Sequence, residues 1–454
     1  MNVELDAPAQ RPPGTLILGA GLTGLSCAFH LKDAPYRLIE RSDGVGGLAR
    51  THRRPHGFLC DGTGHWLHLR QDWTKALVGG LLGDALKPRS RRARVFSRGV
   101  YTQYPFQANT YGLPKDVVEA CLTGFIKARY EERRPEAKNY AEWVRKEFGE
   151  GISSHFMYPY NRKIYGVPLE TLAADFAKKY IPRPSIEDVV RGALGLSREA
   201  LGYNATFVYP TQGGIGALSE ALHAKVTRRA EYHRTPTRID LTTRCAHLDG
   251  GEEAPFGELV STIPLPTLVE LLVAGCPTSV PDSVVDAAGR LRANTVLYFD
   301  IALKGAPNEN QDHHWIYVPE PEFPFYRVGS YSAVEPSLAP PGHRSYYVEI
   351  GHENDHIEPS QLEQPVLDGL RKLGIVERDE DVLFMIPNVL SPAYVLFDDA
   401  YAEARRTILD WLETKRIVSV GRYGRWQYNA MEDALLEGRE AAETILARAN
   451  TPGT

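Results

Sequence analysis

The stretch Thr15–Glu40, TLILGAGLTGLSCAFHLKDAPYRLIE, decides the fold, because it predicts a strand, a tight turn, a helix and a second strand in that order. In the motif GAGLTG, Gly19 permits the turn, Gly21 lets a pyrophosphate approach the backbone, and Gly24 lets the helix pack closely on the strand. The N-terminus of the helix would direct unpaired N–H groups and a partial positive charge at the phosphates. We therefore expect a dinucleotide site.

An acidic residue follows the second predicted strand. Tyr36–Ile39 ends in Glu40, about 20 residues beyond the first glycine of the motif, where a carboxylate accepts hydrogen bonds from ribose hydroxyls. An acid at this position disfavours a 2′-phosphate. The residues thus predict FAD or NAD rather than NADP.

Length and composition describe an ordinary globular protein. At 454 residues and 43% hydrophobic content, the chain can bury a sizeable core in two or three structural units. A net charge of −5 gives no general reason to expect nucleic acid or a membrane as a partner. The 5 cysteines are scattered without metal-ligand spacing, and the N-terminus resembles neither a signal peptide nor an anchor. These features predict a cytoplasmic protein with reduced thiols.

A second glycine cluster distinguishes the two cofactors. Arg41–Thr51, RSDGVGGLART, resembles the extension of FAD-binding oxidases and mutases, in which Gly46, Gly47 and Arg50 line the flavin diphosphate. This resemblance implies FAD. The next stretch, Gly57–His68, is rich in glycine and contains two histidines, but their spacing matches no standard metal site. We predict a flavin-facing loop and no metal.

Two later stretches leave alternatives open. Lys87–Arg98 is basic and predicts a β-hairpin, whose charges form either a solvated face or an attraction for an anionic substrate. Tyr104–Asn109 suits stacking and hydrogen bonding to a base or sugar, or a well-packed corner.

Periodicity divides the remaining chain into helical and β-rich parts. Helical spacing predicts helices at Lys115–Glu131, Asn139–Phe148 and Ser185–Leu194, whereas Phe156–Pro168 is too aromatic and proline-rich for a helix interior. The predicted strands are Tyr203–Pro210, Arg238–Leu241, Glu258–Pro264, Thr295–Asp300, Trp315–Val318, Tyr326–Tyr331, Ser345–Ile350 and Arg416–Gly421. A closing helix begins at Met431, where its backbone donors could meet the cofactor.

These elements predict an α/β fold: a Rossmann-type FAD-binding domain with a helical insertion and an antiparallel β-sheet substrate domain. The expected ranges are 1–85, 205–290 and 410–454 for the discontinuous FAD-binding domain, 110–204 for the helical insertion, and 86–109 with 291–409 for the sheet domain.

Eight blocks along the chain resemble the UDP-galactopyranose mutases and, more distantly, the amine-oxidase and protoporphyrinogen-oxidase flavoproteins. The blocks are GAGLTGL, GVGGLART, GFLCDGTGHWLHL, YPFQAN, PYNRKIYGVP, NATFVYP with QGGIGAL, FPFYR and GRYGRWQY. The resemblance implies a flavin-dependent nucleotide-sugar mutase that interconverts pyranose and furanose forms through attack of reduced flavin N5 on the anomeric carbon.

The resemblance also implies the roles of individual residues. The catalytic residues would be His65, Arg327 and Arg422. The cofactor-binding residues would be Gly19, Gly21, Gly24, Glu40, Gly46, Gly47, Arg50, Gly64, Gly421, Arg422 and Met431. The substrate-binding residues would be Gln107, Asn161, Tyr165, Tyr180, Asn204, Tyr317, Arg327, Tyr394 and Tyr428.

The chain departs from the family pattern at two positions. Tyr180 stands where the family has its second diphosphate-binding arginine. Lys179 or Arg183 is a candidate substitute, although neither is equivalent to a bidentate guanidinium at position 180. Tyr165 replaces a tryptophan near the uridine site. The nucleotide sugar therefore stays open, as does a non-sugar substrate.

Other interpretations remain at this point. Arg327 and Arg422 could be structural ion-pair residues, and the predicted tyrosines could belong to a half-buried core. One alternative function is an FAD-dependent oxidoreductase of the amine oxidase or protoporphyrinogen oxidase type. Another is a non-catalytic FAD-binding protein.

The expected partner is a small molecule, a nucleotide sugar in the leading hypothesis. NAD(P)H is a candidate external reductant, and a homo-oligomer is a candidate assembly.

Overall fold

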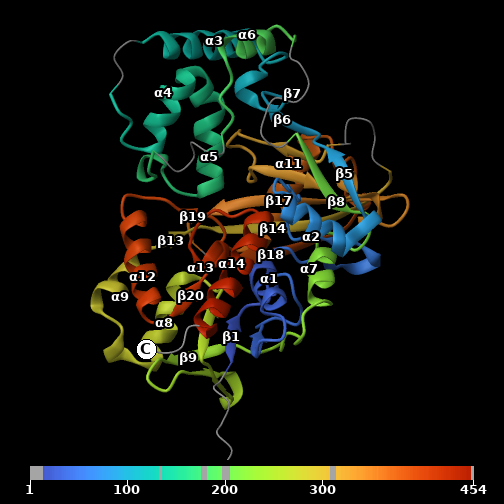
Figure 1. The fold of residues 1–454 in the computed structure, drawn as a ribbon. Coiled ribbons are helices and arrows are strands. Elements are labelled where there is room, and N and C mark those ends of the chain that lie inside the picture. The colour runs from blue at the N-terminus through green and yellow to red at the C-terminus, as the bar shows by residue number, and fades with distance from the viewer. Residues whose placement is uncertain are drawn as a thin grey trace, which may run out of the picture. The chain divides into compact units, whose positions relative to one another are not determined.

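The computed structural model describes residues 14–131, 135–174, 181–196, 205–306, 313–354 and 356–450. The chain forms two compact units, each built from separate segments (Figure 1). Unit 1 consists of Met1–Leu48, Ser219–Leu291 and Glu403–Thr454, and unit 2 of Ala49–Leu218 and Arg292–Ala402. Residues 49–85 and 205–218, which the sequence assigned to the FAD-binding domain, thus lie in unit 2.

A four-stranded parallel sheet forms the centre of unit 1. Its order is β2-β1-β12-β20, and the strands are β1 (Thr15–Leu18), β2 (Tyr36–Ile39), β12 (Glu258–Ser261) and β20 (Ile417–Ser419). Helix α1 (Leu22–Leu31) follows β1 directly, so the predicted strand, turn, helix and strand are confirmed. The fully buried residues of β1 explain its apolar run.

Helix α1 packs on the closing helix α14 (Met431–Asn450). The Ser26 hydroxyl donates to the Leu435 carbonyl at 2.6 Å, and a Cβ on Gly438 would lie 2.3 Å from the Thr23 carbonyl oxygen. The two helices approach so closely that only glycine fits at position 438. The other elements of unit 1 are α8 (Leu265–Gly275), α9 (Asp282–Arg290), α13 (Gly421–Gly424), β9 (Pro236–Asp240), β10 (Cys245–Leu248) and β11 (Glu253–Pro255). Two helices, α7 (Gly216–His223) and α12 (Tyr401–Thr414), begin in unit 2 and end in unit 1.

Unit 2 is organised around a seven-stranded sheet. In sheet order the strands are β18 (Val382–Leu390), β14 (Thr295–Lys304), β17 (His343–His352), β16 (Arg327–Ser330), β15 (Trp315–Tyr317), β6 (Ala93–Ser97) and β7 (Val100–Gln103). All neighbours are antiparallel except β15 and β6, which are parallel. The predicted hairpin is confirmed: β6 and β7 turn at Arg98 and Gly99, whose φ values are 52° and 79°.

The helices of unit 2 include a group shown together in Figure 1, α3 (Lys115–Tyr130), α4 (Tyr140–Ile152), α5 (Tyr158–Tyr165) and α6 (Ile186–Ala193). The remaining elements are α2 (Asp72–Leu82), α10 (Tyr331–Val334), α11 (Glu363–Lys372), β3 (His52–Arg53), β4 (Leu59–Cys60), β5 (Leu86–Ser90), β8 (Thr206–Pro210), β13 (Arg292–Ala293) and β19 (Val395–Leu396). The α3, α4 and α6 predictions are confirmed. At α6 the Ser185 hydroxyl accepts from the Asp188 N–H at 3.1 Å, and the Asp188 carboxylate accepts from the Ser185 N–H at 2.9 Å.

One sequence-based expectation about this group is wrong. The aromatic and proline-rich stretch that begins at Phe156 is helical, because a π-helical turn, Ser153–Met157, runs directly into α5. Pro159 lies in the first turn of α5, where a missing N–H donor does little harm. Tyr160 and Tyr165 are buried in the core of unit 2, which compensates for the modest helix propensity of the aromatic residues.

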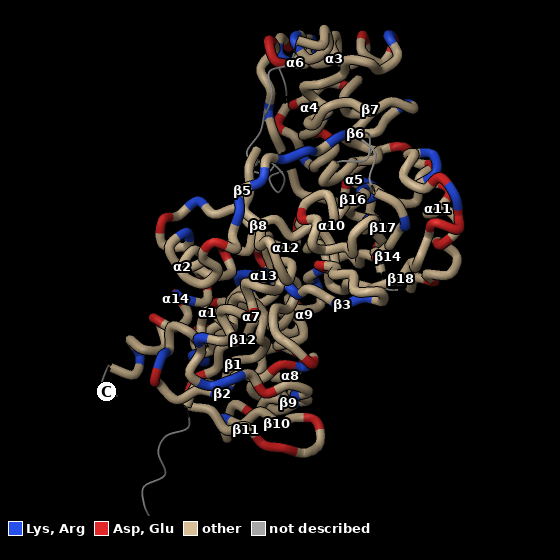
Figure 2. The backbone as a smooth tube through the Cα atoms, turned by 90° about the vertical axis from the view of Figure 1, so that its right-hand side faces the viewer, with Lys and Arg blue, Asp and Glu red and all other residues tan. Residues whose placement is uncertain are grey.

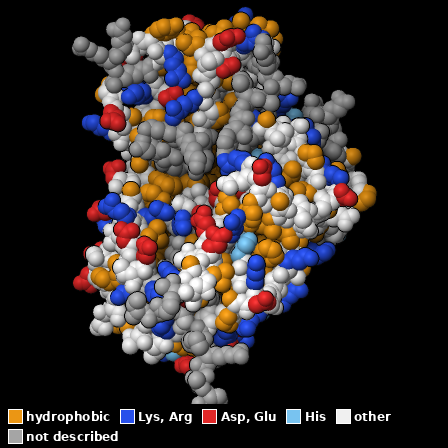
Figure 3. Space-filling model, viewed as in Figure 1, with side chains coloured by type: hydrophobic (Ala, Val, Ile, Leu, Met, Phe, Trp, Pro, Cys, Tyr) orange, Lys and Arg blue, Asp and Glu red, His pale blue; other side chains and the backbone are white. Residues whose placement is uncertain are grey.

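Charged side chains are distributed over the surface in both signs. Figure 2 shows the basic stretch along β5 and β6, and Figure 3 shows acidic and basic side chains interspersed on one face. Within the described ranges, no helix is both long enough and apolar enough to cross a membrane.

Candidate functional site

The glycine-rich turn after β1 has the geometry that the sequence predicts. Gly19 has a φ of 98°, and its N–H donates to the Ile39 carbonyl at 2.9 Å. A Cβ on Gly24 would lie 1.9 Å from the Gly19 carbonyl oxygen, so no larger residue fits there. Gly21 caps α1 and has no side chain to cover the first N–H groups of the helix.

The second glycine cluster packs against this turn, backbone to backbone. The Gly46 N–H donates to the Ala20 carbonyl at 2.9 Å, and a Cβ on Gly47 would lie 3.2 Å from the Gly21 Cα. The two glycine segments therefore meet backbone to backbone with no side chains between them, and this close approach, beside the N-terminus of α1, fits a dinucleotide diphosphate.

Glu40 lies at the end of β2 and is 9% exposed. Its Oε2 accepts from the Ala20 N–H at 2.8 Å, and its Oε1 accepts from the Ser42 N–H at 3.0 Å and the Ser42 hydroxyl at 2.8 Å. These bonds fix the carboxylate beside the turn. Each carboxylate oxygen can accept more than one hydrogen bond, so the group also fits a ribose hydroxyl.

The C-terminal block of unit 1 meets the first turn of α1. Gly421 has a φ of 86°, and a Cβ there would lie 2.8 Å from Thr23 Oγ1. The Gly421 N–H donates to Glu437 Oε2 at 2.6 Å. Arg422 lies over the Tyr428 ring, with its guanidinium carbon 5.0 Å from the ring centroid. The structure thus brings the GRYGRWQY block to the same end of α1 as the glycine motif.

Arg327 and Glu349 form an ion pair in unit 2. They are direct partners on β16 and β17, and the guanidinium donates to both carboxylate oxygens, through Nε to Oε2 and through Nη2 to Oε1 at 2.7 Å. The Arg327 side chain is 22% exposed, whereas that of Glu349 is 3% exposed. Burial alone would lower the pKa of Arg327, but the Glu349 carboxylate outweighs this effect and holds it above the usual value. The accessible member of the pair is a permanent cation.

An array of aromatic rings lies close to this arginine. Tyr317 on β15 stacks on Tyr104 with ring centroids 4.8 Å apart, and Tyr160 packs edge-on against Tyr317 at 5.3 Å. The Arg91 guanidinium carbon lies 4.8 Å from the Tyr104 centroid. Burial raises the pKa of Tyr317, so its hydroxyl remains a hydrogen-bond donor at neutral pH. A flat or anionic ligand would find rings and cations together here.

Four further predicted substrate residues lie in unit 2. The Gln107 side-chain amide donates to the Pro182 carbonyl at 2.8 Å, and that of Asn161 to the Met157 carbonyl at 2.6 Å. Tyr165 packs edge-on against Tyr394 with a centroid separation of 6.3 Å. Tyr165 and Tyr394 thus lie side by side, and their contacts to a substrate stay a prediction.

The remaining predicted substrate residues are placed differently. Tyr428 lies in unit 1, against Arg422, while Tyr180, Asn204 and the candidate substitute Lys179 fall outside the described residues. The other candidate substitute, Arg183, lies over the Trp143 ring at 5.5 Å.

The predicted flavin-facing loop is anchored in unit 2. His65 Nδ1 lies 3.1 Å from the Asp61 carbonyl oxygen. Because a carbonyl only accepts, the neutral imidazole carries its proton on Nδ1. A Cβ on Gly64 would lie 2.4 Å from the Tyr347 hydroxyl, so glycine is required there too. Arg50 is half-buried in the same unit.

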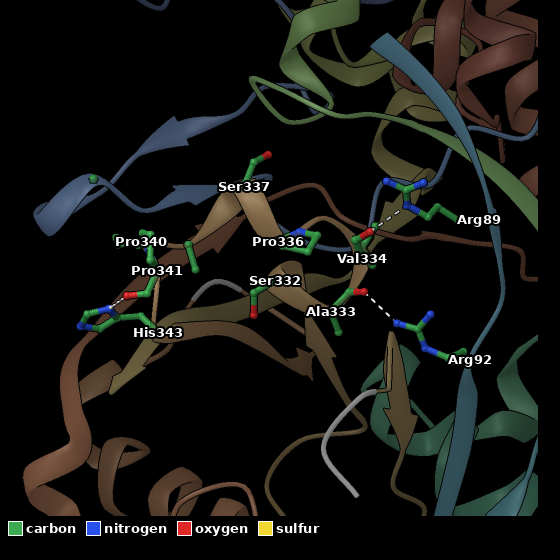
Figure 4. Close-up of a pocket in the computed structure, with 13 residues that line it drawn as sticks. Arg89, Arg92, Ser332, Ala333, Val334, Pro336, Ser337, Pro340, Pro341 and His343 are labelled. Atoms are coloured by element: carbon green, nitrogen blue, oxygen red, sulfur yellow. Dashed lines mark hydrogen bonds between the residues drawn. The ribbon is translucent and has the colours of Figure 1, made fainter. Parts of the chain in front are cut away.

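A separate cavity of about 900 Å³ lies in unit 2 beside the basic segment (Figure 4). Arg89 donates from Nε to the Val334 carbonyl at 3.2 Å and from Nη2 to Glu335 Oε2 at 2.7 Å. Arg92 Nη2 donates to the Ala333 carbonyl at 2.9 Å. These arginines hold the wall of the cavity together, so this part of the basic segment is not simply a solvated face. None of the predicted site residues lines the cavity.

Sequence reasoning missed three residues that shape these sites. Glu349 pairs with Arg327, Tyr160 extends the aromatic array, and the Asp61 carboxylate anchors the His65 loop. The alternation in the segment SYYVEI could have placed Tyr347 and Glu349 on one face of a strand. No local signal distinguished Asp61, because its partners are distant in sequence.

Comparisons with known proteins agree with this geometry. Residues 22–446 match the profile of the family described as flavin containing amine oxidoreductase. The fold is similar to a crystal structure of reduced UDP-galactopyranose mutase, with 24% identity, a TM-score of 0.89, and coverage of 97% of this chain and 95% of that one. It is also similar to a putative protoporphyrinogen oxidase from Exiguobacterium sp. 255-15 (17% identity, TM-score 0.73, coverage 97% and 100%) and a cyclohexylamine oxidase from Brevibacterium oxydans (14%, 0.67, 97% and 100%). At these identities the structures establish a shared fold.

Proposed function

Because the chain belongs to the flavin containing amine oxidoreductase family, which implies an FAD enzyme, we propose that it is a flavin-dependent nucleotide-sugar mutase. The observation that carries the proposal is Arg327, a partly exposed guanidinium held by a buried carboxylate among tyrosine rings. A cation fixed in this way suits a diphosphate better than it suits the apolar cage of an amine oxidase. The similarity in fold to a UDP-galactopyranose mutase also supports this proposal.

The chain's own residues would divide the work as follows. Gly19, Gly21 and the Gly46–Gly47 pair would hold the FAD diphosphate, and Glu40 its ribose. A bound, reduced flavin would supply the nucleophile. Arg327 would hold the diphosphate of the substrate and balance its charge as it leaves the sugar.

Tyrosine hydroxyls would complete the substrate site. The hydroxyls of Tyr317 and Tyr394 would donate to phosphate or sugar oxygens. The Tyr104 ring would offer a stacking surface for a base, with Arg91 adding positive charge beside it. The aromatic walls would limit the access of water to the anomeric carbon.

The test uses the FAD-loaded protein reduced with dithionite and a panel of UDP-, GDP- and dTDP-hexopyranoses, with furanose products separated by chromatography. We expect one nucleotide sugar to be converted and Arg327→Lys to abolish most of the conversion. Arg371→Lys is the matched control, because Arg371 pairs with Asp368 and Asp379 at an exposed site. The absence of any furanose product across the panel would rule out the mutase.

A second candidate is an FAD-dependent oxidoreductase, and one observation favours it. Glu349 neutralises Arg327, so the site is an aromatic enclosure around a charge-balanced pair, which an uncharged or amine substrate could also occupy. Such an enzyme would consume oxygen and form peroxide with its substrate. Peroxide assays over amines and porphyrinogens, with the same Arg327→Lys variant, separate the two functions, since only the mutase needs the arginine.

A further inference from the structure

The Asp61 carboxylate is buried among neutral hydrogen-bond donors. It is 0% exposed, and within the described part of the chain no lysine or arginine forms an ion pair with it. Burial raises the pKa of Asp61 to about 6, against the opposing effect of its hydrogen bonds. A carboxylate in such surroundings costs stability, and acidic groups of this kind are concentrated at functional sites.

Three neutral donors from separate segments hold this carboxylate. Oδ1 accepts from the Thr51 hydroxyl at 2.6 Å and from the Ile215 N–H at 3.2 Å, and Oδ2 accepts from the Tyr209 hydroxyl. A Cβ on Gly214 would lie 2.5 Å from Oδ1, so glycine is needed for this approach. Three of the eight sequence blocks, GVGGLART, GFLCDGTGHWLHL and NATFVYP with QGGIGAL, therefore meet at one side chain.

The residues next to these contacts are the predicted cofactor contacts of unit 2. Arg50 directly precedes Thr51, and the carbonyl of Asp61 itself accepts from His65 Nδ1. On the far side of the loop, Trp66 stacks on Trp315 at 5.8 Å, and the Val208 N–H donates to the Leu67 carbonyl at 3.0 Å. The position of the His65 loop thus depends on an anchor at each end.

We propose that Asp61 is a positioning residue that sets the placement of Arg50 and the His65 loop through its bonds to Thr51, Tyr209 and Ile215. The role of His65 toward flavin rests on the proposed function, but the anchoring of the loop does not. Asp61 would act through the main chain: its carboxylate fixes the residue whose carbonyl selects the Nδ1–H tautomer of His65.

Amide hydrogen exchange of the FAD-loaded full chain tests the anchor directly. Asp61→Asn keeps the shape of the side chain but replaces one acceptor oxygen with a donor and removes the charge. We expect exchange of the amides in 61–67 to become about tenfold faster in this variant, because the loop opens more often. Glu147→Gln is the matched control, since Glu147 is a half-buried acid of unit 2 that pairs with Arg129 at 3.0 Å and should leave 61–67 unchanged.

A second variant keeps the test decisive if Asp61→Asn does not fold. Tyr209→Phe retains the carboxylate and removes one donor, so a smaller acceleration, about threefold, is expected in the same segment. Unchanged exchange of 61–67 in every folded variant would overturn the inference. If exchange of 61–67 accelerates in the variants but the wild type converts no nucleotide sugar, the inference stands and the proposed function is removed. If the wild type converts a nucleotide sugar but exchange of 61–67 is unchanged in the variants, only the inference is removed.

Discussion

Arg327 and Glu349 face each other across β16 and β17, and two parallel N–H···O bonds join them. Glu349 occupies the edge of the guanidinium formed by Nε and Nη2, and the Arg327 side chain is still 22% exposed. The ion pair that the sequence left open is present, and the role of Arg327 as an anion clamp stays a prediction. Glu349 is buried and fixes Arg327, which is partly exposed.

The first prediction concerns this pair. Arg327→Lys keeps a positive charge but loses the bidentate guanidinium. We therefore expect the affinity for a nucleoside diphosphate to fall about 30- to 100-fold, which is a loss of roughly 2–3 kcal/mol of binding free energy. Glu349→Gln leaves the arginine without its buried counter-charge and should lower the free energy of unfolding by about 3 kcal/mol. Calorimetric titration with UDP and urea unfolding measure the two effects. Equal UDP affinity in wild type and Arg327→Lys would show that the arginine is structural only.

The second prediction concerns Tyr317. Tyr317→Phe preserves the stack on Tyr104 but removes a hydroxyl that is hydrogen-bonded to Tyr104 and Trp315, so the free energy of unfolding should fall by about 1–2 kcal/mol. If the hydroxyl donates to the substrate, the KM for the nucleotide sugar should rise about fivefold, as expected for the loss of one hydrogen bond. Tyr101→Phe is the control, because the Tyr101 hydroxyl donates to the Leu373 carbonyl instead. A KM that is the same in Tyr317→Phe as in wild type would contradict a substrate contact.

The third prediction concerns the glycine turn. Gly24→Ala would place a methyl group 1.9 Å from the Gly19 carbonyl oxygen, which forces α1 away from β1. We expect the variant to be purified with little FAD and to melt at a lower temperature, as measured by flavin absorbance and thermal unfolding. In contrast, Gly80→Ala in α2 meets nothing within 4 Å and should stabilise the protein by about 0.5–1 kcal/mol. Full FAD content in Gly24→Ala would argue against the turn as the diphosphate site.

The fourth prediction concerns pH. Since burial raises the pKa of Asp61 from 3.8 to about 6, the folded state binds this proton more tightly than the unfolded chain does. The contribution of Asp61 to stability is therefore fully present below pH 3.8 and is lost as the pH rises through 6. The difference in pKa corresponds to about 3 kcal/mol.

Urea unfolding of wild type and Asp61→Asn between pH 4.5 and 8 would isolate this contribution. Asp300, whose charge acts on Asp61, and Glu335, whose charge acts on its partner Tyr209, are the same in the two proteins. The stability of wild type relative to the variant should decline as the pH increases. A difference that stays constant over this range would mean that Asp61 does not titrate there.

The sequence by itself determined the local architecture of the cofactor site. The boundaries of β1, α1 and β2 follow from apolar runs and three glycines, and the start of α6 follows from the Ser185–Asp188 capping box. These features depend on backbone geometry and on contacts between residues close in the chain. Such interactions leave periodic or short-range patterns that sequence reasoning can detect.

Only the tertiary structure decided which distant residues meet. The pairing of Arg327 with Glu349 depends on the register of two strands, and the contacts of Asp61 join segments that begin at Thr51 and end at Ile215. The helical state of Tyr158–Tyr165 likewise depends on burial of its tyrosines in the core of unit 2. Long-range packing and hydrogen bonding outweigh local propensity at these places, and neither leaves a period in the sequence.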